Sequence, residues 1–476
     1  MDAAGVGGGM MGSCKRKSVM PPCGEAVKMT AELFPSNKRK RLVVSVCTVL
    51  LPHDMMLEVL LRLPVKSILR FRAVCRSWAA LFSSKDFRSL HMAISKVLSP
   101  APKLLVVSPT SRAESSAVYS YSPSAHRDDL LFTFDSARHN TVEVVMPSSC
   151  CGLTLLFDAA APAYYVCNAA TRAITRLPDL RHPLREYTAG LGFDDQTREY
   201  KVVRLINTFN SEKGVVMCDV YTPGADCWRP AARELPFGLF QLAISAVQHA
   251  FMNKISPVFA NGFLHWLVLP FFTVKRPRAA IILFSVADET FGSVRSPPFW
   301  GPTVMNRPWS EAGGEHLVVM DGQLCIVRNL RNGTLHGSAL EIWGLLDYGS
   351  GNWSPNHRID LFGRIRRELS DPQVVRVIGS VGNCRSRKKI VIVTSKDWDW
   401  VHRKFEKKVY SYDPTRQVLK RIRSVTETNI PAAYSIHGLR FSLFEESLTP
   451  VNKTDEDLAL PPTLAKATIK KLLLET

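Results

Sequence analysis

The sequence has 476 residues, of which 46% are hydrophobic, so it is long and apolar enough for two or three domains with packed cores. Its net charge of +19 is uneven, because residues 1–98 carry 16 Lys and Arg against 6 Asp and Glu. Basicity concentrated at one end argues against a large nucleic-acid-binding domain. No run reaches the roughly 18 apolar residues that a membrane helix needs, so we expect no membrane partner.

Residues 1–45 are predicted to be a disordered basic tail, because they contain few aromatic residues and little periodicity. Lys38, Arg39, Lys40 and Arg41 form a basic cluster that suits either a nuclear import signal or a solvated run of charge. The 11 cysteines include no C-x-x-C pair, and no signal peptide is visible. We therefore expect reduced thiols and a location in the nucleus, the cytoplasm or both.

Residues 46–98 are predicted to form a module of three short helices. Asp54, Glu58 and Arg62 fall four residues apart and form one polar stripe, whereas every other position from Met55 to Leu63 is apolar. Residues 65–71 and 74–82 supply two more short amphipathic segments. Three short helices rarely bury enough surface to be stable alone. The remaining cover is therefore either the rest of this chain or another protein.

This segment resembles the F-box of plant F-box proteins over residues 49–92. The resemblance lies in Leu51-Pro52, in the run from Leu63 to Phe71, and in Val74-Cys75 followed by Trp78. Met55-Met56 stands where the family often has two leucines, a mild departure because Met fills similar space. The resemblance implies docking on a Skp-type adaptor, which holds the F-box on a cullin–RING ubiquitin ligase. The residues that we expect in this docking surface or its supporting core are Leu51, Pro52, Leu57, Val59, Leu60, Leu63, Pro64, Leu69, Val74, Cys75 and Trp78.

Residues 99–448 consist of short runs of β-branched and aromatic residues separated by turn residues, a pattern typical of strands. Residues 103–107, 153–157, 200–205 and 390–393 are predicted strands. Asn261-Gly262 and Asp321-Gly322 lie between apolar runs and predict hairpins, because both residues of such a turn take a positive φ.

A loose repeat runs through the same region, with successive offsets of 47, 55, 63, 59 and 67 residues. The copies begin at Val118, Tyr165, Val220, Leu283, Ile342 and Val409. Periods of roughly 40–50 residues with four strands each are typical of propeller blades, and longer periods imply insertions. We predict an α+β multidomain chain, in which the helices precede a mainly-β, propeller-like domain of six irregular blades. A β-sandwich with long loops is the alternative, and residues 449–476 are a C-terminal tail.

The β region also resembles the F-box-associated domain that follows plant F-boxes, a kelch-like relative whose Gly-Gly doublets are missing here. The matching pieces include residues 167–172, 200–204, 261–266, 321–325 and 412–414. The resemblance implies a domain that recruits a protein substrate for ubiquitination.

The sequence contains no G-x-S-x-G, H-E-x-x-H, P-loop or EF-hand pattern, so we predict a non-catalytic subunit without cofactor or metal. His265 is expected to pack inside a blade. The predicted function is substrate recognition in an SCF-type ligase. The alternative is a basic propeller that binds chromatin or RNA and has no ligase role.

The longest repeat intervals, 220–283 and 342–409, predict insertions, and binding residues concentrate in such loops. They contain Trp, Phe and Arg residues of the types enriched in binding hot spots. The candidates for substrate contact are Arg364, Trp398 and Trp400, with Phe237 and Phe240 as a pair that could equally be buried.

Overall fold

The computed structural model describes residues 53–98 and, with gaps, residues 102–453. The gaps are 113, 123–126, 139–140, 181–185, 211–212, 269–278, 301–314, 332–337, 371–372, 383–387, 396–403 and 429–438. The described residues from 53 to 453 belong to one compact unit. Both the helical module and the β domain belong to it.

Four helices precede the strands: α1 (His53–Leu61), α2 (Val65–Phe71), α3 (Arg76–Ser83) and α4 (Lys85–Leu98). Two of the residues that carry the F-box resemblance lie immediately before helices. Pro64 precedes α2 with a φ of −59°, and the Cys75 sulfur accepts a hydrogen bond from the backbone N–H of Trp78 at 3.4 Å. Helix α4 was not predicted, although Ser84 marks its start by accepting the N–H of Phe87 on its hydroxyl oxygen at 3.2 Å.

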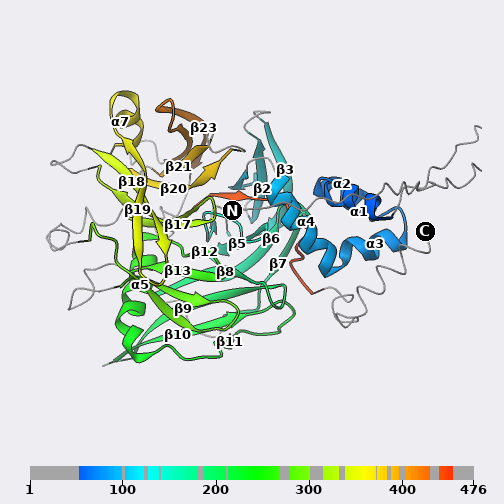
Figure 1. Ribbon diagram of the computed structural model, residues 1–476, viewed down its shortest axis with the longest axis horizontal. Helices are drawn as coiled ribbons and strands as arrows, with labels where there is room; N and C mark the ends of the chain where they lie inside the picture. The colour runs from blue at the N-terminus through cyan, green and yellow to red at the C-terminus, as the bar shows by residue number, and fades with distance from the viewer. Residues whose placement is uncertain are drawn as a thin grey trace, which may run out of the picture. The chain divides into compact units, whose positions relative to one another are not determined.

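The described strands form six antiparallel sheets of four strands each (Figure 1). The first three sheets, in strand order, are β24 (Phe441–Phe444), β1 (Lys103–Pro109), β2 (Ser115–Ser122), β3 (Arg127–Asp135); β4 (Val142–Val144), β5 (Leu153–Asp158), β6 (Ala163–Asn168), β7 (Ala173–Arg176); and β8 (Glu186–Asp194), β9 (Glu199–Asn210), β10 (Lys213–Tyr221), β11 (Arg229–Pro230).

The other three sheets keep the chain order. They are β12 (Val258–Ala260), β13 (Phe263–Leu267), β14 (Ala279–Ser285), β15 (Phe291–Arg295); β16 (His316–Met320), β17 (Gln323–Asn329), β18 (Ala339–Asp347), β19 (Asn352–Asp360); and β20 (Val374–Val381), β21 (Lys389–Ser395), β22 (Lys404–Asp413), β23 (Val418–Thr428).

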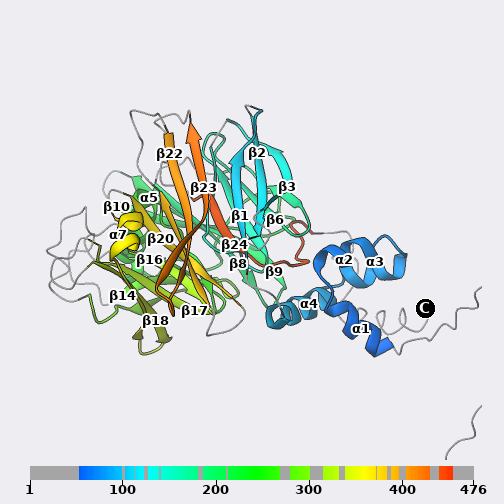
Figure 2. The same ribbon diagram turned by 90° about the horizontal axis from the view of Figure 1, so that it is seen from above.

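This arrangement is a six-bladed β-propeller, so the predicted fold class is confirmed and the sandwich alternative is wrong. Each of the six repeat copies begins in the third strand of its sheet, from Val118 in β2 to Val409 in β22. The first blade combines both ends of the domain, because β24 pairs with β1 and places Leu443 opposite Leu104 (Figure 2). Such closure leaves few free strand edges.

Both predicted hairpins are present. Asn261 and Gly262 have φ values of 52° and 82° between β12 and β13, and Asp321 and Gly322 have values of 56° and 79° between β16 and β17. Positive φ at both turn positions is the type I′ geometry that matches the strand twist.

The two long repeat intervals contain helices. A short 3₁₀ helix, η1 (Phe237–Leu239), leads into α5 (Phe240–Asn253) between the third and fourth blades, and α7 (Gly363–Leu369) lies between the fifth and sixth. Ala243, Ala246 and Val247 bury α5 in the same apolar cluster as strands of the second, third and fourth blades. This insertion is therefore part of the propeller core.

His265 is packed inside the fourth blade, as expected. Its side chain is fully buried, and its Nδ1 donates to the carbonyl oxygen of Val258 at 3.3 Å. Burial lowers the pKa of His265 to about 4, so the ring is neutral near pH 7.

Candidate docking surfaces

The four helices share a small apolar core that is completed by one residue from beyond the propeller. The buried members are Leu60, Leu61, Val65, Ile68, Leu81, Phe82, Phe87 and Leu448. A series of rings crosses this core from Phe71 through Trp78, Phe82 and Phe87 to His91, with successive centroids 5.1–6.0 Å apart. Trp78 thus holds α2 and α3 together.

The predicted adaptor-docking residues differ in exposure. Val59 and Val74 are 55% and 64% exposed, and Pro64 is exposed as well. Leu60 is 3% exposed, so it can affect a docking surface only by supporting the helices. The half-buried residues are Leu57, Leu63, Leu69, Cys75 and Trp78. Leu51 and Pro52 lie outside the described residues, and docking itself stays a prediction.

Exposed apolar side chains gather on this module. Among the described residues, twelve large apolar side chains are exposed, and six of them lie at residues 53–98, five on the helices and Val74 between α2 and α3. These six are Met55, Val59, Val74, Leu90, Val97 and Leu98. Met55 lies one turn before Val59 on α1, and Leu90 lies two turns before Val97 on α4, so each pair shares one face of its helix, although spacing does not distinguish an exposed apolar pair from a buried one. Such a concentration is typical of an interaction surface.

Residues 445–453, which follow β24, connect the helices to the propeller; we call this segment the clasp. Asn168 donates from its amide nitrogen to the carbonyl oxygens of Ser447 and Thr449 at 3.1 and 2.8 Å. The Tyr200 hydroxyl donates to the carbonyl oxygen of Val451 at 2.6 Å. Leu448, which lies in the same segment, enters the core of the helices. The start of the predicted C-terminal tail is therefore bound to the blades.

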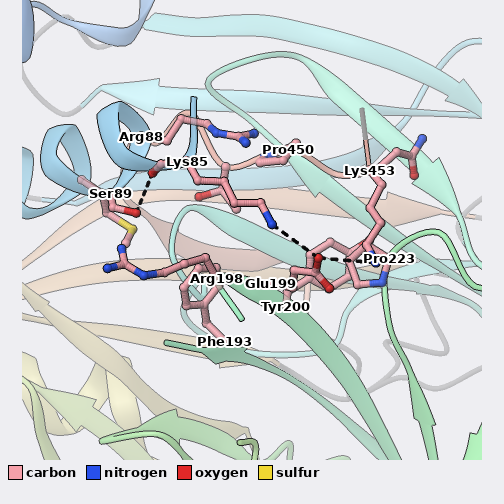
Figure 3. Close-up of a pocket in the computed structure, with 13 residues that line it drawn as sticks. Lys85, Arg88, Ser89, Phe193, Arg198, Glu199, Tyr200, Pro223, Pro450 and Lys453 are labelled. Atoms are coloured by element: carbon pink, nitrogen blue, oxygen red, sulfur yellow. Dashed lines mark hydrogen bonds and ion pairs between the residues drawn. The ribbon is translucent and has the colours of Figure 1, made fainter. Parts of the chain in front are cut away.

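An ion-pair network lies beside the clasp in a small cavity of about 40 Å³ (Figure 3). Glu199 at the start of β9 is 3.8 Å from the Lys85 ammonium of α4 and 3.4 Å from the Lys453 ammonium of the clasp. These cations are 43% and 34% exposed, so each pair contributes at most about 1 kcal/mol. Arg88 and Arg198 also line the cavity, which makes its wall basic.

A larger cavity of about 310 Å³ lies between the α1–α2 turn, α4 and the clasp. Leu63 and Pro64 line it together with His91 and Glu446. His91 is buried, and its Nε2 donates to the carbonyl oxygen of Leu63 at 2.9 Å. Burial lowers the pKa of His91 and keeps the ring neutral, so Nδ1 accepts a hydrogen bond from the Ser95 hydroxyl at 3.4 Å while Nε2 donates to Leu63.

The predicted substrate residues are only partly described. Arg364 is exposed on α7, whereas Trp398 and Trp400 lie outside the described residues. Phe237 is 95% exposed in η1 and Phe240 is half-buried, so only the first of this pair is available to a partner. The basic cluster at residues 38–41 also lies outside the described residues.

The described residues contain no group of three or more His, Cys, Asp and Glu side chains placed to hold a metal ion. Burial raises the pKa of the Cys167 and Cys325 thiols to about 12, so both stay protonated and are poor nucleophiles. None of the described helices has the length and apolar character to cross a membrane.

Comparisons with known proteins identify the family. Residues 103–438 match the family model described as "F-box associated beta propeller domain", and residues 49–90 match the F-box domain. An F-box protein of Arabidopsis thaliana is 26% identical over 411 residues, which cover 83% of this chain and 97% of the relative. An F-box/kelch-repeat protein of the same plant is 29% identical over 262 residues, covering 52% and 65%.

Solved structures add little. A six-bladed propeller lectin of Aleuria aurantia is 9% identical, covers 70% of this chain and 98% of its own, and has a TM-score of 0.31, which is too low to support an argument. The propeller model, however, spans well over half of the sequence, directly after the F-box match. The chain therefore belongs to the F-box associated β-propeller domain family.

Proposed function

We propose that this protein is the substrate-recognition subunit of an SCF-type cullin–RING ubiquitin ligase. Helices α1–α4 dock on a Skp-type adaptor, and the propeller holds a protein substrate. The observation that carries the proposal is that six of the twelve exposed large apolar side chains among the described residues belong to this small helical module. Membership of the family and similarity to F-box proteins support it.

In this role the chain contributes position and leaves the chemistry to other subunits. A substrate held near a charged ubiquitin-conjugating enzyme reacts at a high effective concentration, so a bimolecular transfer becomes nearly unimolecular. The advantage is greatest when the two binding parts are joined stiffly. The clasp supplies such a joint, because Leu448 packs with the helices while Val451 packs with the blades.

The test replaces exposed apolar residues of the helical module, one on α1 and one between α2 and α3, in the full chain. Val59→Asp and Val74→Asp each put an unpaired charge into the proposed interface, which costs several kcal/mol when buried. We expect each variant to bind a purified Skp-type adaptor at least about tenfold more weakly, since about 1.4 kcal/mol is a factor of ten. Binding is measured by titration calorimetry, with circular dichroism as the check on folding.

Leu346→Asp is the matched control, because Leu346 is 59% exposed but lies on β18 of the propeller. It should bind the adaptor as the unmodified chain does. Leu60→Asp is unsuitable, since a charge at a 3% exposed core position would unfold the helices. Unchanged adaptor affinity in both valine variants would refute the proposed docking surface.

A further inference from the structure

Helix α7 is fixed firmly between the fifth and sixth blades. Ile365 and Leu369 are buried in the same apolar cluster as Tyr410. The Tyr410 hydroxyl donates to the carboxylate of Glu368 at 2.7 Å, and Arg331 donates from Nη1 to the carbonyl oxygen of Leu369 at 2.9 Å. The last contact satisfies a carbonyl group that a helix leaves free at its end. The helix is therefore a rigid support for the side chains on its other face.

The outward face of α7 is strongly basic. Arg364, Arg366 and Arg367 are exposed, and Arg421 of β23 is exposed directly opposite Tyr410 in the β22–β23 ladder. Phe362, which precedes the helix, is 54% exposed. We call these five residues the α7 surface. Within the described part of the chain, none of its four guanidinium groups forms an ion pair.

Several other arginines of the propeller are paired, whereas the α7 surface brings together four exposed arginines that form no ion pair with the described residues. Arg229 contacts Glu289, Arg358 contacts Asp360 at 2.8 Å, and the Arg423 guanidinium lies 2.6 Å from Asp128. Like charges three residues apart on a helix, such as Arg364 and Arg367, are neighbours on its surface and repel one another. A ligand that brings carboxylates would relieve this repulsion while satisfying planar guanidinium groups, which bind carboxylates through two parallel hydrogen bonds.

We propose that the α7 surface binds an acidic segment of a protein substrate that also carries an apolar side chain, which packs on Phe362. This inference rests on the proposed function, which requires the propeller to hold a protein. Single-stranded nucleic acid is a poorer match, because its binding grooves use successive aromatic rings for base stacking. The α7 surface offers one ring.

The experiment uses the full chain bound to its adaptor. The probe is a fluorescent peptide of glutamates around one central Leu, and the comparison peptide has Gln in place of every Glu. Fluorescence anisotropy should show that the chain binds the acidic peptide and not the Gln peptide. This binding should weaken as the salt concentration rises from 50 to 300 mM, because exposed charges are screened. Arg366→Glu with Arg367→Glu should weaken it at least about tenfold, since each substitution turns an attraction into a repulsion.

Two matched variants separate this surface from general basicity. Arg233→Glu changes an exposed arginine between β11 and η1 and should leave peptide affinity unchanged. Phe362→Ala should lower the affinity for the peptide with the central Leu. It should not change the affinity for a peptide in which Gly replaces that Leu. Equal affinity of the unmodified chain and the double arginine variant would overturn the inference. Tighter binding of a single-stranded oligonucleotide, lost in the same double variant, would also overturn it.

Adaptor titration of the same samples distinguishes the two proposals. If the acidic peptide fails to bind while the adaptor still binds, the inference about the α7 surface is wrong and the proposed function stands. If the adaptor itself fails to bind the unmodified chain, the proposed function is wrong.

Discussion

Leu448 completes the core of the F-box helices although it follows the last propeller strand, and its replacement tests this connection directly. The side chain is 8% exposed and packs in the cluster that contains Leu60, Phe82 and Phe87. Full burial of a leucine stabilises by about 1.5–3 kcal/mol, and Leu→Ala substitutions in cores cost about 2–5 kcal/mol with the cavity included. Because Leu448 lies at the edge of the cluster, we expect about 2–3 kcal/mol for Leu448→Ala.

A helical module this small has little stability to lose. At about 1.36 kcal/mol per factor of ten, the expected loss multiplies the open population of the helices by about 30 to 150. Hydrogen exchange measured by mass spectrometry should therefore accelerate in α1–α4 by a factor in this range, while exchange in the central strands of the blades stays the same.

The control is Leu346→Ala, the same substitution at a 59% exposed position. It should change hydrogen exchange neither in the helices nor in the central strands of the blades. Unchanged exchange of the helices in Leu448→Ala would refute the reasoning, because the F-box core would then be complete without the clasp. Equal acceleration in helices and blades would refute it as well, since the effect would then be one on the whole fold.

Three further predictions follow from particular residues. Burial alone would raise the pKa of Glu289, but hydrogen bonds from Arg229, a backbone N–H and Lys201 lower it to about 2 from the ordinary 4.5. The resulting stabilisation of about 3 kcal/mol is present above pH 4.5 and lost as the pH falls toward 2. Glu289→Gln should therefore lower the free energy of unfolding measured in urea at pH 7. It should also reduce the loss of stability of the protein on acidification. Asn168→Ala leaves two clasp carbonyls without their buried donor and should cost about 2 kcal/mol, seen as faster exchange in the clasp. Replacing residues 38–41 by Ala should move a tagged protein toward the cytosol if they form an import signal; an unchanged distribution would mean solvated charge only.

Most of the propeller could be predicted from the sequence, because its signals are local. A blade strand buried on both faces requires a run of apolar residues, and a hairpin such as Asn261-Gly262 needs only two residues with positive φ. Helix α5 was missed because residues 240–253 are apolar on most sides, and a short apolar run does not distinguish a buried helix from a strand.

The proposed docking surface could be predicted only as a mixture of core and interface. Leu60 and Val59 are neighbours of similar hydrophobicity on one helix, yet the first is buried and the second is exposed. What separates them is the packing of α1 against other elements, including Leu448 from the far end of the domain. No periodicity within α1 carries that information, so exposure had to come from the tertiary structure.

The same blade receives the chain from the helices and returns it to them. Helix α4 ends at Leu98, β1 begins at Lys103 and pairs with β24, and the clasp follows β24 directly. The helices are therefore joined to the propeller covalently and also by contacts, among them the packing of Leu448 and the ion pair between Lys85 and Glu199. A joint with two connections restricts bending more than a single tether, and effective concentration falls as the accessible volume grows. On the proposed function, loosening the clasp should thus slow ubiquitin transfer to a bound substrate while leaving the affinity of that substrate for the propeller unchanged.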